Sequence, residues 1–99
     1  MTETFLDAVR DRVVVYDGAM GTCLQERDLG PDDFGGPDLD GCNELLVVTR
    51  PDVIAEIHAE YFAVGCDIVE TNTFGANAVP LAEYGIEDRA YELNQAAAR

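Results

Sequence analysis

Two short stretches of this chain hold the residue types that bind small polar molecules. The first is Asp17-Gly18-Ala19-Met20-Gly21-Thr22, directly after an apolar run. Its glycines allow the backbone to approach a ligand, and free amides in such a turn can hold a carboxylate. The Asp17 carboxylate can bind an amino group, so the stretch fits an amino acid. A tight Asp-Gly turn that binds nothing accounts for the same residues. No Gly-Lys-Ser/Thr follows, so this is not a Walker loop.

The second stretch is Glu70-Thr71-Asn72-Thr73-Phe74-Gly75, which also follows an apolar run. It supplies an acid, hydroxyls, an amide and an aromatic ring, a mixture that suits a small polar ligand with an apolar body. Capping and turn formation by Thr and Asn is the alternative explanation. Because both stretches follow predicted strands, we expect them to face one site.

The predicted strands and the helix between them must position these residues. Val13–Tyr16 and 67–71 are apolar runs without alternation, as in strands of a parallel sheet that are buried on both faces. Between them, Pro51 begins a predicted helix and Gly65 stops it. Its apolar residues recur at helical spacing, namely Ile54, Ile57, Tyr61 and Val64. The order strand, loop, helix, strand, helix predicts a parallel α/β architecture.

The other segments follow from local signals. We expect short helices over 4–10 and 22–27, and a loop over 28–42, which is rich in Gly, Pro and Asp. Asn77 is expected to cap a further helix. The last helical segment reaches Arg99 without a Gly, Asn or Pro stop signal. We therefore expect the chain to be a fragment.

Charge and hydropathy exclude several functions. The chain has 99 residues, with 20 acidic and 6 basic residues and a formal net charge of −14. Binding to nucleic acid and binding to an anionic membrane surface both require clustered Lys and Arg, so neither partner is expected. The start of the chain lacks the basic and apolar regions of a signal peptide, and no apolar run is long enough to span a membrane. We expect a cytoplasmic protein.

The cysteines and the single histidine do not form a recognisable metal site. Cys23, Cys42 and Cys66 include no Cys-x-x-Cys pair, and an odd, sparse set does not indicate a disulfide framework. His58 has no partner at metal-ligand spacing. We expect the cysteines to be packing thiols and His58 to be structural.

Taken together, three stretches resemble homocysteine S-methyltransferase domains of the cobalamin-dependent methionine synthase type. They are 17–22, then 41–46 together with 49–54, and 70–77. The resemblance runs over residues 12–99, which leaves 1–11 as a leader segment within one domain fragment spanning 1–99. The stretch 43–46 favours methionine synthases over the betaine-dependent relatives. A bifunctional relative fused to methylenetetrahydrofolate reductase stays open.

The resemblance implies a fold and a substrate site. The family's domain is a (β/α)8 TIM barrel, of which this chain would contain the first two or so βα units. Homocysteine would bind at the carboxyl ends of the strands. Asp17 and Gly18 match positions near the amino acid end of homocysteine, and Thr73 and Phe74 match positions that line the pocket. The assignment of Glu70 to the substrate site rests mainly on its place at a strand end.

The resemblance also implies the chemistry of the full-length enzyme. There, a zinc ion held by three cysteines would keep homocysteine as a thiolate, which takes a methyl group from methylcobalamin to give methionine. Methyltetrahydrofolate would recharge the cobalamin through later domains. Nothing in this chain matches the family's adjacent zinc cysteines, so no metal or cofactor is expected on it, and no catalytic residue is assigned. We expect the 99 residues alone to be inactive. A non-catalytic small α/β binding module, or a remnant that folds only on a partner, stays an alternative.

Overall fold

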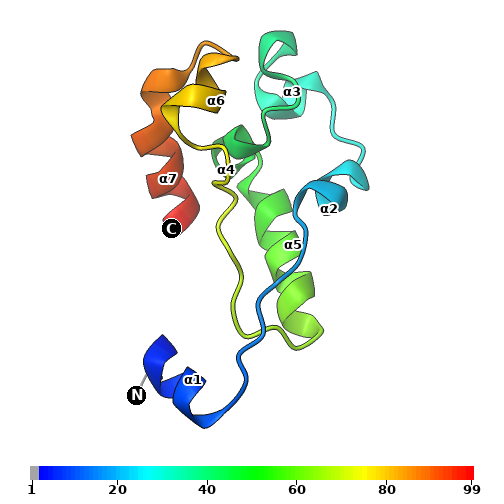
Figure 1. Cartoon of the computed structure of the whole chain (residues 1–99). Coiled ribbons are helices and arrows are strands. Elements are labelled where there is room, and N and C mark those ends of the chain that lie inside the picture. Colours follow the sequence, from blue (N-terminus) through cyan, green and yellow to red (C-terminus); the bar gives the residue numbers. More distant parts are fainter. Residues whose placement is uncertain (1–2) are drawn as a thin grey trace.

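The structure is a computed structural model that describes residues 3–99, and it is built from short helices and connecting segments (Figure 1). The longest helix, α5, spans Pro51–Ala63 and lies in the middle of the molecule. The other elements are α1 Phe5–Asp11, α2 Gly21–Gln25, α3 Pro31–Phe34, η1 Pro37–Leu39, η2 Asn43–Leu45, α4 Leu46–Thr49, α6 Ala78–Ala82, η3 Glu87–Arg89 and α7 Ala90–Ala98.

The expected βα units of a TIM barrel are wrong for this chain, because residues 3–99 contain no sheet. The segments 13–16 and 67–71 lie side by side, but they meet in one isolated parallel bridge between Tyr16 and Ile68. Parallel strands are stable when both of their faces are covered. Here Val13 is 85% exposed and Val15 is 48% exposed. The burial that would stabilise an extended strand is therefore missing from both segments.

Helix α1 confirms the helix expected over 4–10, although little of it is buried. Thr4 caps it, since its hydroxyl accepts from the amide of Asp7 at 3.1 Å. Of the residues in α1, only Ala8 is buried, whereas Phe5 is 52% exposed. The helix lies at one end of the molecule, with α3 and α6 toward the other (Figure 1). Polar contacts of Arg12 connect this end to the rest of the chain.

The segment 28–42, predicted as a loop, contains the short helices α3 and η1. Pro31 occupies the first turn of α3, and the Asp33 carboxylate accepts from the amide of Gly30 at 2.9 Å. Gly35 ends this helix with a φ of 104°, a conformation that glycine adopts without a steric penalty. A composition typical of loops therefore concealed a capped helical turn.

Helix α5 begins at Pro51 as predicted, and Gly65, with a φ of 106°, follows its end. It packs on a first core cluster, which comprises Leu24, Phe34, Leu46, Val53, Ile54 and Ile57. Ile57, a member of this cluster, is completely buried. Val64, predicted on the same face, lies beyond the helix and is 81% exposed.

A second core cluster joins the end of the chain to α4. Asn77 caps α6 as predicted, since its side-chain oxygen accepts from the amide of Val79 at 3.3 Å. Helix α7 then packs on α4, with Leu93 completely buried. The buried members of this cluster are Cys42, Leu45, Val47, Ala76, Leu81 and Leu93. Consecutive residues around α4 thus enter different clusters, which makes α4 the connection between the two.

The molecule is extended rather than spherical, with principal dimensions of 47 × 27 × 21 Å. Its radius of gyration is 15.1 Å. A compact chain of this length would have a radius of about 13 Å. None of the helices in the described part of the chain is both long and apolar enough to cross a membrane.

Candidate functional site

The residues predicted from the sequence to bind a substrate lie around one cavity of about 340 Å³. Asp17 and Gly18 line one side of it, while Glu70, Thr73 and Phe74 line another. Met20, Gly21, Asn43, Glu44, Thr71 and Asn72 complete the lining. Small-molecule sites in proteins have volumes of roughly 300–1,000 Å³. The two stretches singled out in the sequence therefore share a space that is large enough for an amino acid.

A backbone pairing brings Asp17 and Glu70 together. The amide of Asp17 donates to the carbonyl of Ile68 at 3.0 Å, which aligns the two extended segments. The Asp17 carboxylate in turn accepts from the amide of Glu70, with 3.2 Å between nitrogen and Oδ2. The first stretch is thus joined to the second by contacts of both backbone and side chain. No sheet is needed for this alignment, since the single parallel bridge supplies it.

The second stretch forms a compact turn on the cavity wall. The hydroxyls of Thr71 and Thr73 lie 2.7 Å apart, and the amide of Thr73 donates to the carbonyl of Thr71 at 2.9 Å. Asn72 is buried, and its amide group donates to the carbonyl of Asn43 at 2.7 Å. Phe74, in contrast, is fully exposed at the rim. Its ring therefore does not form an apolar wall within this chain.

Glu44 is a lining residue that the sequence pattern did not assign to the site. It follows Asn43 at the start of η2, and its carboxylate accepts from the amide of Gly75 at 3.2 Å. A side chain at Gly75 would meet this carboxylate, since a Cβ built there lies 3.1 Å from it. In the sequence, the stretch 43–46 contributes only to the family resemblance. The signal that could have placed Glu44 in the site is that it is an acidic residue directly after Asn43.

The charge of the cavity is negative. Asp17, Glu44 and Glu70 contribute carboxylates, and the described lining contains no arginine or lysine. The basic side chains with ion pairs lie elsewhere, as in the contacts of Arg27 with Glu56 and Glu60. Carboxylates without a basic partner attract cations. A ligand with an ammonium group fits this potential, and one with only anionic groups does not.

The cysteines do not fit the zinc ion that the resemblance implies for the full-length enzyme. Cys23 Sγ contacts the carbonyl of Ala19 at 3.3 Å, and Cys66 Sγ contacts that of Tyr16 at 3.5 Å. Cys42 is buried in the second core cluster, where burial raises the pKa of its thiol. Within residues 3–99, no group of three or more His, Cys, Asp or Glu side chains is arranged to hold a metal ion. Cys42 is therefore a packing group of the second core cluster, while Cys23 and Cys66 contact backbone carbonyls.

The sequence places the chain in a known family of transferases. The sequence profile of the homocysteine S-methyltransferase family matches residues 14–99, and the chain belongs to this family. The match includes both stretches that line the cavity.

Individual relatives narrow the comparison to one type of protein. The chain is 57% identical over 90 residues to a protein named methionine synthase from Mycobacterium tuberculosis (strain ATCC 25618 / H37Rv). The aligned residues cover 91% of the chain and 7% of that protein. It is 53% identical over 90 residues to a methionine synthase from Mycobacterium leprae (strain TN), with the same coverage. The chain therefore spans about 7% of the length of these relatives.

Proposed function

We propose that this chain is the homocysteine-binding part of a methionine synthase, an enzyme that transfers a methyl group to the thiolate of homocysteine. The observation that supports the proposal most strongly is the cavity shared by Asp17, Gly18, Glu70, Thr73 and Phe74. These residues come from stretches 53 positions apart, joined by the contact of the Glu70 amide with Asp17. Membership of the homocysteine S-methyltransferase family supports the same function.

The charges of the cavity indicate which end of homocysteine it would hold. The carboxylates of Asp17, Glu44 and Glu70 line the cavity, and an ammonium group satisfies them. Gly18 lines the cavity beside Asp17, and the backbone amides of such a turn can hold a substrate carboxylate. We therefore assign the amino acid end of homocysteine to this chain and leave its sulfur outside it.

The rest of the proposed reaction rests on parts of the protein outside these 99 residues. The zinc ligands, the cobalamin that supplies the methyl group and the methyltetrahydrofolate that recharges it are all assigned there. The 99 residues alone would then bind substrate without transferring a methyl group. A cytoplasmic location and the organisation into a leader, 1–11, and a family-like region, 12–99, belong to the same proposal. Stoichiometric zinc uptake by the purified chain would contradict the assignment of the zinc ligands to other parts of the protein.

A titration of the ¹⁵N-labelled chain with L-homocysteine, followed by NMR, tests the proposed function. Amide signals of 17–18 and 70–74 are expected to shift in a saturable manner. The same titration with 4-mercaptobutanoate, which lacks only the amino group, should give much weaker binding. Equal binding of both compounds would exclude the role proposed for the carboxylates.

Matched variants separate the site from general effects of charge. Asp17→Asn and Glu70→Gln each remove one carboxylate from the cavity and should weaken homocysteine binding by about tenfold, as expected for a charge-assisted contact of roughly 1.4 kcal/mol. Asp38→Asn is the control, because Asp38 is exposed in η1 and lies outside the cavity lining. If all three variants bind equally, the binding site lies elsewhere.

A further inference from the structure

Helix α5 reaches both stretches of the cavity from behind through two side chains that do not line it. His58 Nε2 lies 3.0 Å from the carbonyl oxygen of Glu70. One turn further on, the hydroxyl of Tyr61 donates to the carbonyl of Ala19 at 2.6 Å. Residues three apart on a helix share a face, so both contacts come from the same side of α5. Each side chain bonds the backbone of one of the two stretches.

These contacts close a ring of hydrogen bonds around the site. His58 holds the carbonyl of Glu70, while the amide of the same residue donates to Asp17 at 3.2 Å. Tyr61 holds Ala19, two residues after Asp17, and so returns the ring to α5. The distance between the two stretches is therefore determined from two directions, by their direct contact and by a common helix.

The approach of Tyr61 to the first stretch leaves little free space. A Cβ built at Gly18 would lie 3.1 Å from the Tyr61 hydroxyl oxygen. Cys23 also lies near this hydroxyl, with its Sγ 3.7 Å from the oxygen. The contact with Cys23 raises the pKa of Tyr61, so the phenol keeps the proton that it donates to Ala19. The carbonyl of Glu70 likewise requires a proton on Nε2 of His58.

We propose that His58 and Tyr61 are positioning residues that hold the segments 17–19 and 70–71 at the spacing that homocysteine requires. The inference rests on the proposed homocysteine site and adds residues that do not touch the substrate. It also explains why a helix outside the cavity presents the chain's single histidine and a tyrosine to two backbone carbonyls. Loss of either bond removes one of the contacts that hold that stretch and changes no side chain that lines the cavity.

Homocysteine affinity in paired variants of the full 99-residue chain is the first readout. His58→Ala and Tyr61→Phe are each expected to weaken binding about three- to tenfold, the equivalent of one hydrogen bond. His58→Gln keeps an N–H donor near the position of Nε2 and should restore most of the affinity. Tyr91→Phe is the control for the loss of a hydroxyl, since Tyr91 is 81% exposed on α7. The unfolding midpoint of each variant is measured alongside its affinity. If His58 had a purely structural role, His58→Gln and His58→Ala variants of equal stability would bind homocysteine with equal affinity.

NMR observation of the bonds themselves is the second readout and needs no ligand. Long-range ¹H–¹⁵N spectra at alkaline pH should show His58 in the tautomer protonated at Nε2. The carbonyl ¹³C signal of Glu70 should move in His58→Ala, and that of Ala19 in Tyr61→Phe. An Nδ1-protonated tautomer together with unmoved carbonyl signals would overturn the inference.

The two readouts distinguish failure of the inference from failure of the proposed function. If the wild-type chain binds homocysteine and both His58→Ala and Tyr61→Phe bind it equally well, the positioning role is excluded and the proposed function stands. If the wild-type chain does not bind homocysteine, the proposed function fails. Homocysteine is then also excluded as the ligand of the site that His58 and Tyr61 position. The tautomer and carbonyl signals then still determine whether α5 holds the two stretches.

Discussion

Two groups of residues in this chain have different consequences for the site. One group contacts the cavity, and its polar atoms act through charge and hydrogen bonds, as Glu44 does on the amide of Gly75. The other group lies in the two core clusters and acts through burial, as Leu93 of α7 does. Substitutions in the first group should change ligand binding and local order. Substitutions in the second should change the free energy of unfolding.

Glu44 connects η2 to the turn that ends the second stretch. Glu44→Ala removes the acceptor of the Gly75 amide and should lower the free energy of unfolding by about 1 kcal/mol, as for a partly exposed hydrogen bond to a carboxylate. Glu44→Gln keeps an acceptor oxygen and should cost less. Urea unfolding of both variants checks the order. Equal losses for Ala and Gln would mean that the bond contributes nothing.

Leu93 is completely buried in the second core cluster. Leu93→Ala leaves a cavity there and should lower the free energy of unfolding by about 2–5 kcal/mol. Val79→Ala is a control of similar chemistry, because Val79 is 81% exposed on α6. Calorimetry or urea unfolding provides the comparison. A loss for Leu93→Ala no larger than that for Val79→Ala would show that α7 is not packed on α4 in solution.

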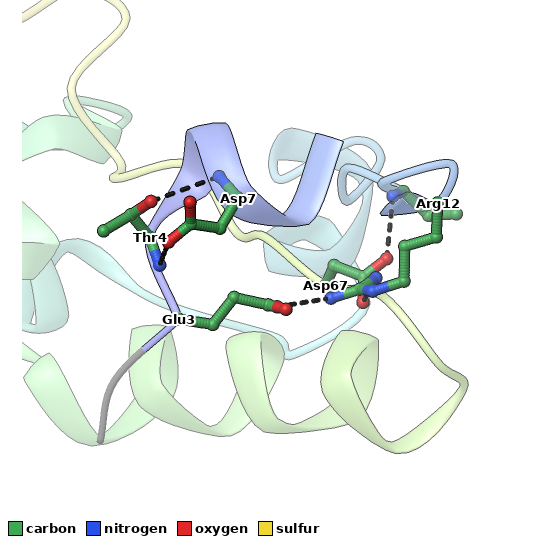
Figure 2. A network of polar contacts seen from close by, with 6 residues as sticks. Glu3, Thr4, Asp7, Arg12 and Asp67 are labelled. Carbon is green, nitrogen blue, oxygen red and sulfur yellow. Dashed lines mark hydrogen bonds and ion pairs between the residues drawn. The ribbon is translucent and has the colours of Figure 1, made fainter. Parts of the chain in front are cut away.

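At the scale of elements, α1 depends on polar contacts more than on burial. In Figure 2 the Arg12 guanidinium lies between Glu3 and Asp67. Its nitrogens lie 3.1 Å from Glu3 Oε1 and 2.6 Å from Asp67 Oδ1. Asp67 also accepts from the amide of Val15 at 2.9 Å, which connects the end of the first extended segment to the second. Since the residues of α1 bury little apolar surface, these contacts should determine how α1 and its following segment are held.

The Asp67 contacts predict a loss of stability in acid. The amide of Val15, and then Arg12, lower the pKa of Asp67 below its ordinary value. A carboxylate with a lowered pKa stabilises the folded chain fully above the ordinary pKa of about 3.9, and this contribution disappears as the pH falls through the lower folded value. The urea midpoint of the wild-type chain should therefore exceed that of Asp67→Asn at pH 6, and the difference between the two midpoints should shrink toward pH 3.

Asp33 provides an internal check on this acid effect. Its pKa is lowered too, first by the amide of Gly30 and then by Arg50, so wild type and Asp67→Asn both lose that contribution in acid. Only the difference between the two proteins reports Asp67. A difference that stays constant from pH 6 to pH 3 would mean that the carboxylate charge of Asp67 does not hold the segment.

At the scale of the whole molecule, charge and shape act together. The formal net charge is −14, and the radius of gyration exceeds that of a compact chain of equal length. Like charges destabilise a compact state through mutual repulsion. Exposed ion pairs such as Arg89 with Glu92 offset little of this, because surface pairs contribute about 1 kcal/mol or less.

Salt should therefore stabilise this chain. Between about 0.01 M and 1 M NaCl the Debye length falls from about 30 Å to about 3 Å, which screens repulsion across the whole surface. The urea midpoint is expected to rise over this range, even though the exposed ion pairs weaken. A falling midpoint would show that the ion pairs, and not the excess of acidic residues, dominate the electrostatic free energy.

Local signals in the sequence determined much of this protein. Pro51 and Gly65 set the bounds of α5, Asn77 caps α6, and the acids and turns at 17–18 and 70–74 mark the residues that line the cavity. These features depend on residues close together in the chain, where spacing and capping chemistry suffice. The capped turn within 28–42 was missed because its glycines and prolines are equally typical of loops.

Whether the two apolar runs became strands depended on tertiary packing. Their composition predicted buried parallel strands, but a strand is stable only when other parts of the chain cover its faces, and Val13 and Val15 are left exposed. Likewise, no local pattern indicates that His58 and Tyr61 contact the carbonyls of Glu70 and Ala19. Contacts between residues far apart in sequence depend on how the chain packs, and that packing brings α5 behind the cavity.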